Sequence, residues 1–412
     1  MTKTRGAMPD AIIRRSFLKI ALSAAAFLAY QGRASAASFA QWVEKFRARA
    51  LARGVSEATY REVLGAVKPD TSVYALDRAQ PEFTEKLWQY LNRRVSDWRI
   101  TTGKERANEY AELLARIERE YAVDRYTMLG LWGNESAFGD VVTSYTLMRP
   151  VIPALAALAW GERRRRRYWE QELLNALVIV ERGWAKPEEM IGSWAGAMGH
   201  TQWMPEVWLH MGVDFNGDGR ISPYGPPDDA LAGTARYLLT RGKYKRGIEW
   251  GYEVRLGGAK RGGTRTFAAW RKLGVVRADG EAFEHPNEPA RLWRPIPGGP
   301  AFLLTRNFFA VRSYNPSNNY TLAVLHLGDR IRGGGPFVQP FPGGERTPTL
   351  AELQEIQRPL SASTPAAPTD GSGTTPWSRC VHSSAKLTSF RRTAIRGLRY
   401  WRGCAMEAEP SG

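Results

Sequence analysis

The sequence of 412 residues is poor in the residue types that crosslink proteins or bind transition metals. Its two cysteines, Cys380 and Cys404, both lie near the C-terminus, so the body of the chain folds without disulfides or cysteine-ligated metal. The five histidines show no zinc-site spacing. No run of 18 apolar residues is present. These absences exclude a disulfide-rich scaffold, a zinc site and an ordinary membrane-spanning helix.

Aromatic residues and positive charge are plentiful instead. With 43% hydrophobic and 24% charged residues, the composition is globular rather than disordered, collagen-like or coiled-coil, and the length allows two or three domains. The 15 tryptophans indicate an aromatic-lined surface, although core packing explains most of them. A net charge of +17 favours an anionic polymer as partner: nucleic acid, anionic lipid or acidic wall glycans. The arginine run 163–167 fits such a polymer, but runs of this kind are more often solvated faces.

The N-terminal segment has the pattern of an export signal. Ile-Arg-Arg-Ser-Phe-Leu-Lys at 13–19 precedes an apolar run over 20–30 and a small-x-small site at 34–36. The paired arginines favour a twin-arginine signal over 1–36, with a mature protein that begins near Ala37 in a bacterial periplasm. No cysteine lies near this site, so no lipid anchor is expected. An N-terminal amphipathic helix is the alternative.

The region 37–343 is predicted to be mainly α-helical. Apolar residues recur at helical spacing from Phe39 onward, and Asp124 is placed to cap a helix from Arg125 to about Ala137. Glycine, proline and short β-branched runs over 250–300 predict a small β element, and an amphipathic helix is expected over 320–331. From 344 to 412, one helix-like stretch gives way to a Pro, Ser, Thr, Ala and Gly-rich tail.

A first chemical motif surrounds Glu135. On a helix, Met128, Leu131, Trp132 and Glu135 follow the spacing i, i+3, i+4, i+7, so the carboxylate lies on the apolar stripe. Partial desolvation there is expected to raise the pKa of Glu135, as a general acid for glycosidic cleavage requires. The alternative is a glutamate whose head merely reaches solvent at the helix end.

A second motif is the Gly-rich segment 192–205, Gly-Ser-Trp-Ala-Gly-Ala-Met-Gly-His-Thr-Gln-Trp-Met-Pro. Its glycines permit close backbone approach. Ser193 and Gln202 offer hydrogen bonds to sugar hydroxyls or amides, while Trp194 and Trp203 offer stacking surfaces. The alternative is an ordinary Gly-rich turn, since many such turns have a similar composition.

A third motif, D-x-N-x-D-G-x-I over 214–221, is the front half of an EF-hand calcium loop. Asp214, Asn216 and Asp218 supply side-chain oxygens, and Arg220 supplies a backbone carbonyl. Gly225 occupies the place of the usual closing glutamate, so a longer loop closed by an aspartate at 228–229 is expected. The predicted Ca²⁺ is structural; the alternative is an Asx-turn without an ion.

In this order, the three motifs resemble those of the lytic murein transglycosylases of the B type, over about residues 38–342. The resemblance implies a lysozyme-like, mainly helical core with one catalytic glutamate, at Glu135, and no cofactor for catalysis. It implies cleavage of the β-1,4 bond between N-acetylmuramic acid and N-acetylglucosamine, with formation of 1,6-anhydromuramic acid. It assigns glycan contacts or cleft positions to Ser193, Gln202, Tyr237, Tyr314, Asn315 and Tyr320. The same resemblance favours Asp229 over Asp228 as the aspartate that closes the calcium loop.

The tail departs from the resemblance. Residues 350–358 resemble the first helix of a small peptidoglycan-binding module, but the expected second half does not follow. A shifted reading frame or a decayed module explains this pattern, and translation of the gene in the other two frames tests it.

Peptidoglycan strands are therefore the expected partner of a periplasmic monomer. One rival function is a muramidase-type hydrolase on the same scaffold, with Asp140 as its second carboxylate. A second rival is a non-catalytic peptidoglycan-binding protein. Nucleic acid is not expected as a partner, given the export signal and the lack of a recognisable nucleic-acid-binding motif.

Overall fold

The computed structural model describes residues 38–78, 85–142, 148–258 and 262–342. The predicted export signal and the tail over 344–412 lie outside these residues.

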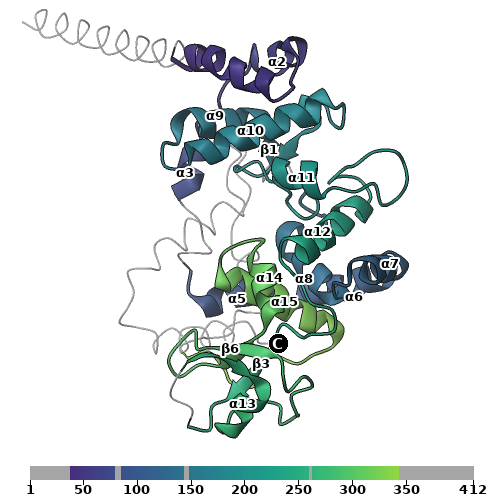
Figure 1. Ribbon diagram of the computed structural model, residues 1–412, viewed down its shortest axis with the longest axis vertical. Coiled ribbons are helices and arrows are strands. Elements are labelled where there is room, and N and C mark those ends of the chain that lie inside the picture. Colours follow the sequence, from purple (N-terminus) through teal and green to yellow (C-terminus); the bar gives the residue numbers. More distant parts are fainter. Residues whose placement is uncertain (1–37, 79–84, 143–147, 259–261, 343–412) are drawn as a thin grey trace, which may run out of the picture. The chain divides into compact units, whose positions relative to one another are not determined.

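The described chain is mainly helical, as expected (Figure 1). Residues 38–52 form a first helix. The further helices are α2 (Glu57–Leu64), α3 (Val73–Arg78), α5 (Leu87–Arg94), α6 (Asp97–Glu109), α7 (Ala111–Tyr121), α8 (Arg125–Ser136), α9 (Val151–Gly161), α10 (Arg166–Glu181), the 3-10 helix η1 (Pro187–Glu189), α11 (Pro205–Met211), α12 (Asp228–Thr240), α13 (Phe267–Lys272), α14 (Arg306–Arg312) and α15 (Asn318–Arg332).

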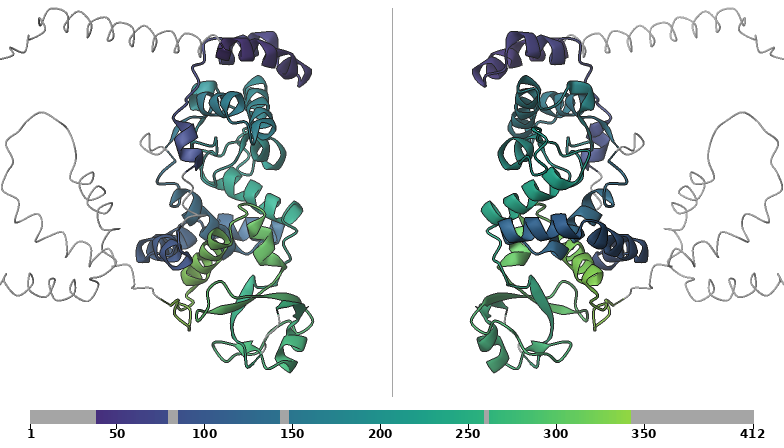
Figure 2. Two further views of the ribbon diagram at one scale, coloured as in Figure 1. Left: turned by 90° about the vertical axis from the view of Figure 1, so that its left-hand side faces the viewer. Right: turned by 90° about the vertical axis from the view of Figure 1, so that its right-hand side faces the viewer.

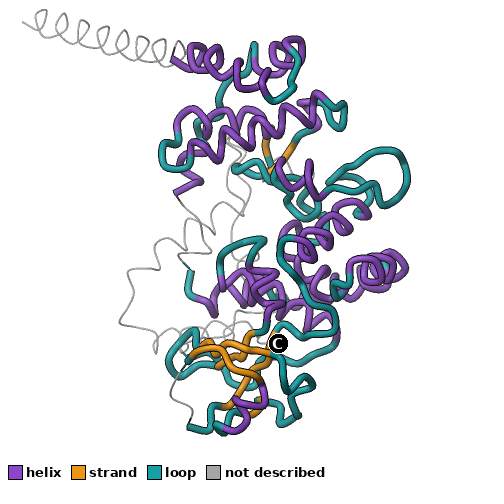
Figure 3. The backbone as a smooth tube through the Cα atoms, viewed as in Figure 1, coloured by secondary structure: helices purple, strands orange, loops and turns teal. Residues whose placement is uncertain are grey.

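The β structure forms one antiparallel sheet and one short pair. The pair joins β1 (Arg149–Pro150) to β2 (Ile191–Gly192). The sheet has the order β4-β6-β7-β3-β5, built from β3 (Gly251–Arg255), β4 (Gly263–Thr266), β5 (Val276–Arg277), β6 (Pro289–Trp293) and β7 (Ala301–Leu304). Helix α13 lies beside this sheet (Figures 2 and 3). Phe267, Trp270 and Leu303 are buried in the small core that this sheet shares with α13.

Helices α8 and α15 form a closely packed pair within one hydrophobic core. Neither helix is amphipathic, because both bury residues on all sides, which corrects the expectation for 320–331. Glycines let the two backbones approach. A Cβ at Gly130 of α8 would lie 2.1 Å from the carbonyl oxygen of Val324, and one at Gly328 of α15 would lie 2.5 Å from that of Tyr126.

A second hydrophobic core surrounds the α9–α10 hairpin. Helix α9 is almost wholly apolar and buried, and α10 presents Trp169, Leu173 and Leu177 to the same core. The hydroxyl of Tyr74 in α3 donates to the carbonyl of Ala157, 2.8 Å away. Helices α11 and α12 link this core to the one around α8. Trp208 of α11 packs in the core around α9 and α10, and Leu231 of α12 packs in the core around α8. In the described part of the chain, no helix is both long and apolar enough to cross a membrane.

Candidate functional site

Glu135 lies in the last turn of α8. The helix begins where predicted, because the Asp124 side chain accepts from the backbone N–H of Thr127 at 2.9 Å. It ends one residue after Glu135, where Ala137 and Phe138 take left-handed conformations with φ of 54° and 60°. The Glu135 side chain is half-buried, while its neighbours in the helix are buried. The helix end therefore presents one acidic side chain at the margin of the core.

Tyr320 holds the Glu135 carboxyl group from the neighbouring helix. Its ring is 4% exposed at the start of α15, and its hydroxyl donates to Oε1 of Glu135. Burial raises the pKa of Tyr320 well above its ordinary value, and the charge of Glu135 raises it further. Tyr320 consequently remains a hydrogen-bond donor over the whole working pH range. The sequence resemblance placed both residues in one site, and the structure brings them into contact.

Tyr314 and Tyr237 form an aromatic pair near the Glu135 carboxyl group. Their ring centroids lie 5.1 Å apart with the planes at 81°. The hydroxyl of Tyr314 donates to the carbonyl of Thr201 at 2.6 Å, and that of Tyr237 donates to the carbonyl of Ser313 at 2.9 Å. Burial and the charge of Glu135 raise the pKa of Tyr314. The pair thus connects three segments near Glu135: α12, the Gly-rich segment and the segment before α15.

Asn315 has a local role in the same segment. Its Oδ1 accepts from the backbone N–H of Ser317 at 3.1 Å, and the Ser317 side chain caps α15 by accepting from the N–H of Tyr320. Asn315 is half-buried, so part of its side chain remains accessible beside Tyr314.

Ser193 and Gln202 lie in two consecutive tight turns, over 193–197 and 198–203. Met198 and Trp203 exchange two backbone hydrogen bonds of 2.8 Å, which close the turn between them. Ser193 Oγ accepts from the N–H of Ala197 at 3.2 Å. Gln202 has a φ of 54°, and its amide donates to the carbonyl of Gly199 at 3.0 Å. Both predicted glycan-contacting side chains are half-buried and keep polar atoms for a ligand.

The prediction for Trp203 is corrected by its burial. The side chain is 0% exposed, and its indole N–H donates to Oγ1 of Thr234 at 2.9 Å. Thr234 in turn bonds to the hydroxyl of Thr201 at 2.9 Å. Gly233 allows this packing, because a Cβ there would lie 2.4 Å from the indole ring. Trp203 therefore supports the Gly-rich segment from the core and offers no surface for a sugar. Trp194, by contrast, is half-buried.

His200 supports the candidate site, although sequence reasoning did not single it out. Its Nδ1 accepts from the indole N–H of Trp132 at 3.1 Å, so its Nε2 carries the proton and donates to the carbonyl of Gly225 at 2.7 Å. The Ser136 hydroxyl donates to the His200 carbonyl at 2.6 Å. Burial lowers the pKa of His200, which favours the neutral ring. His200 thereby ties the end of α8 to the Gly-rich segment, and no spacing in the sequence signals this contact.

The predicted calcium loop folds around its own acidic side chains. Asp214 accepts from the backbone N–H of Gly217, Asp218 and Gly219 at 2.7, 3.1 and 2.8 Å. Oδ1 of Asn216 accepts from the N–H of Asp218 at 3.0 Å. Oδ1 of Asp218 accepts from the N–H of Arg220 at 2.8 Å. Asp214, Asn216 and Asp218 are all exposed, so their remaining lone pairs are open to a hard cation.

Asp229 contacts this loop, at the start of α12. Its oxygens accept from the N–H of Phe215 at 2.8 Å and of Ser222 at 2.9 Å. Burial raises the pKa of Asp229, and the nearby charge of Asp214 raises it further. The donors are the oxygens that Ca²⁺ prefers. Within the described residues, however, no three His, Cys, Asp or Glu side chains already converge on one point.

Asp140, the second carboxylate of the rival hydrolase, is exposed beyond the end of α8. Its Oδ1 lies 3.9 Å from Nη2 of Arg106. The charge of Asp140 is thus directed towards a guanidinium.

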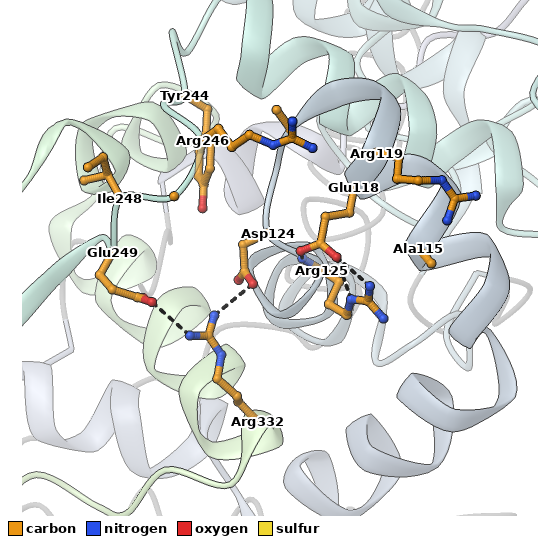
Figure 4. Close-up of a pocket in the computed structure, with 12 residues that line it drawn as sticks. Ala115, Glu118, Arg119, Asp124, Arg125, Tyr244, Arg246, Ile248, Glu249 and Arg332 are labelled. Carbon is orange, nitrogen blue, oxygen red and sulfur yellow. Dashed lines mark hydrogen bonds and ion pairs between the residues drawn. The ribbon is translucent and has the colours of Figure 1, made fainter. Parts of the chain in front are cut away.

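A pocket of about 420 Å³ is lined by Asp124 and Arg125 at the start of α8 (Figure 4), whereas Glu135 lies in the last turn of that helix. Arg332 bridges Asp124 and Glu249 across it at 2.8 and 3.1 Å, and Arg125 pairs with Glu118 at 2.6 Å. The predicted site residues are not part of its wall.

A match to the transglycosylase SLT domain family spans residues 38–329. The chain belongs to this family, whose lytic transglycosylases are enzymes that act on peptidoglycan. It is 27% identical over 293 residues to the membrane-bound lytic murein transglycosylase B of Escherichia coli (strain K12). The aligned part covers 68% of this chain and 79% of that protein.

Solved structures agree with this assignment. SltB3 from Pseudomonas aeruginosa in complex with NAG-anhNAM-pentapeptide has a TM-score of 0.67 and 36% identity, over 79% of this chain and 87% of that chain. The Escherichia coli lytic transglycosylase Slt35, solved in complex with calcium, has a TM-score of 0.60 and 25% identity, over 72% of this chain and 92% of that chain. The mainly helical, lysozyme-like fold predicted from the sequence is confirmed.

Proposed function

We propose that this protein is a lytic transglycosylase that cleaves the β-1,4 bond between N-acetylmuramic acid and N-acetylglucosamine and forms 1,6-anhydromuramic acid. The observation that carries the proposal is the Tyr320–Glu135 hydrogen bond, which orients one acid at the end of α8. The matched SltB3 structure holds a NAG-anhNAM-pentapeptide, a fragment with the anhydro ring that this reaction forms.

In the first step, Glu135 acts as the general acid. Because Oε1 accepts from Tyr320, the transferable proton is carried by Oε2. This proton passes to the glycosidic oxygen as the bond from C1 of the muramic residue to that oxygen breaks. The N-acetylglucosamine leaves with a hydroxyl group, and Glu135 becomes a carboxylate that still accepts from Tyr320.

In the second step, the same carboxylate acts as the base. It removes the proton from the O6 hydroxyl of the muramic residue while O6 bonds to C1, so Glu135 ends protonated and no water is consumed. One acid suffices because the nucleophile belongs to the substrate and has a high effective concentration. Ser193, Gln202, Asn315 and the tyrosines would hold the glycan, with no cofactor taking part.

A structural Ca²⁺ in the loop over 214–229 is part of the proposal. Asp214, Asn216, Asp218, the carbonyl of Arg220 and Asp229 would be its ligands. Asp229 is preferred to Asp228 because it already bonds to two backbone N–H groups of the loop. The calcium in the matched Slt35 structure supports this assignment.

Location and organisation are also proposed from the sequence. Residues 1–36 would direct twin-arginine export to the periplasm, 37–343 would form the catalytic region, and 344–412 would be a linker and degenerate tail. The protein would act as a monomer without a membrane anchor.

Product analysis on purified peptidoglycan tests the activity. We expect soluble muropeptides that mass spectrometry finds lighter by one water than the reducing-end products of a hydrolase. Reducing-end products would identify a muramidase. Wall binding without any soluble product would identify a non-catalytic binding protein.

A further inference from the structure

Five arginines in succession, at 163–167, form an exposed cationic surface over the α9–α10 connection and the start of α10, here called the arginine patch. In the described part of the chain, none of the five guanidinium groups forms an ion pair with a carboxylate. Glu162, the nearest acidic residue in sequence, accepts instead from the backbone N–H of Arg164 at 2.8 Å. The patch is thus not neutralised by its own neighbourhood.

Among the residues that the structure describes, two of the five guanidinium groups have a contact that supports the fold. Arg165 stacks over the rings of Tyr168 and Trp169, at 4.4 and 4.7 Å from their centroids. Arg166 donates to the carbonyl of Trp160 at 3.1 Å. Arg163, Arg164 and Arg167 form no hydrogen bond through their guanidinium groups within the described residues.

The position of the patch is electrostatically unfavourable for the folded chain. Arg166 and Arg167 lie in the first turn of α10, which has no acidic residue there. Cations at a helix N-terminus are disfavoured by the helix dipole, and adjacent like charges repel each other. The guanidinium groups of Arg163, Arg164 and Arg167 are therefore available to an external anion.

Aromatic contacts connect the patch to the proposed glycan-binding segment. Trp169, which Arg165 covers, contacts Trp194 edge to face with centroids 6.3 Å apart. Trp194 is half-buried and adjacent to Ser193. Ring contacts therefore link the segment proposed to hold the glycan to the base of the patch.

We propose that the arginine patch binds the carboxylates of the stem peptides on the same peptidoglycan strand that the catalytic site cleaves. This inference rests on the proposed function, because it takes peptidoglycan as the substrate. Stem peptides carry carboxylates along a strand, and guanidinium groups bind carboxylates through paired hydrogen bonds. The patch would increase the affinity for the strand and fix its orientation, while other residues hold its sugars.

The test compares two substrates. Soluble glycan strands that carry stem peptides are digested in parallel with the same strands stripped of their stems by an amidase. The variant Arg163→Gln/Arg164→Gln/Arg167→Gln removes three charges and leaves the packed Arg165 and Arg166 in place. A control variant, Arg119→Gln/Arg271→Gln/Lys272→Gln, removes three exposed charges elsewhere.

On stem-bearing strands at low salt, we expect the patch variant to lose about three- to hundred-fold in kcat/KM, since each of the three exposed ion pairs contributes a factor of about 1.5 to 5. The loss should shrink at high salt, because exposed charges are screened. On stem-free strands, all three proteins should turn over equally. Equal losses on both substrates, or an equal loss in the control variant, would overturn the assignment.

A binding arm separates this inference from the proposed function. If the unmodified protein forms no anhydro product from either substrate, the proposed function fails. The patch can still be tested without turnover. Glu135→Gln is added to each charge variant, and binding of both strand types is measured. Vesicles of phosphatidylglycerol form the last arm: an effect of the patch variant confined to vesicle binding would assign the patch to lipid and reject the stem-peptide proposal.

Discussion

The contact between α8 and α15 predicts that one methyl group at Gly130 impairs catalysis. In Gly130→Ala, the new Cβ would lie 2.1 Å from the carbonyl oxygen of Val324 and 3.0 Å from the backbone nitrogen of Gly328. A carbon and a carbonyl oxygen in contact are about 3.3 Å apart. Both obstacles are backbone atoms, so the two helices must separate by about 1 Å.

Two opposing free energies decide the sign of the stability change. Alanine favours an isolated helix over glycine by about 1 kcal/mol. Overpacking of a filled core costs about 1–3 kcal/mol, and a collision with backbone belongs at the upper end of this range. The net destabilisation is therefore about 1–2 kcal/mol, which lowers Tm by several degrees.

The effect on turnover is expected to be larger than the effect on folding. Gly130 and Glu135 share α8, while Tyr320 belongs to α15, so separation of the helices lengthens the Tyr320–Glu135 hydrogen bond. A displacement of about 1 Å in a catalytic group can reduce the rate by about 10²-fold. Release of anhydro-muropeptides, measured well below the Tm, reports this loss separately from unfolding.

The control is Gly335→Ala, because a Cβ at Gly335 has no atom within 4 Å. This variant should retain both Tm and turnover. Gly328→Ala should reproduce the Gly130→Ala defect from the other helix, since its Cβ would lie 2.5 Å from the carbonyl oxygen of Tyr126. Full activity and an unchanged Tm in Gly130→Ala would refute the argument that this contact positions the acid.

Three further predictions concern the acid, the metal loop and a buried carboxyl group. Glu135→Gln should reduce product release by at least about 10²–10⁴-fold while circular dichroism and glycan binding are unchanged, because each proton transfer contributes about this factor. Asp140→Asn should retain turnover, and a comparable loss there would favour the hydrolase. Millimolar Ca²⁺ should raise the Tm through preferential binding to the folded state, but not in Asp214→Ala/Asp218→Ala; equal shifts in both proteins would exclude the site. Burial raises the pKa of Glu172 from 4.5 to about 7, so the folded state keeps a proton that the unfolded state releases. Stability should therefore fall as pH rises through this window, by at most about 3 kcal/mol, and Glu172→Gln should flatten the slope in urea titrations between pH 5 and 8. An unchanged slope would contradict the buried titration.

Features that depend on neighbours in the chain were predictable from the sequence. The start of α8 is one example, because the Asp124 side chain caps an amide only three residues away. The turns of the loop over 214–220 are another, since Asp214 bonds to amides no more than five residues away. Such contacts are specified by local residue types and spacing, whatever the rest of the protein does.

Only the tertiary structure decided which side chains meet and which are buried. Tyr320 and Glu135 lie 185 residues apart in the chain, and their hydrogen bond exists because α8 and α15 pack at Gly130 and Gly328. Trp203 looked like a stacking surface, but Thr234 and Gly233 from α12 enclose it.

His200 shows the same limit of local reasoning. Its partners Trp132 and Gly225 come from segments 68 residues before it and 25 residues after it, so no short pattern contains the whole contact. The physical reason is that burial and long-range hydrogen bonds depend on how every helix packs. Residue spacing determines only which face of each helix is available for that packing.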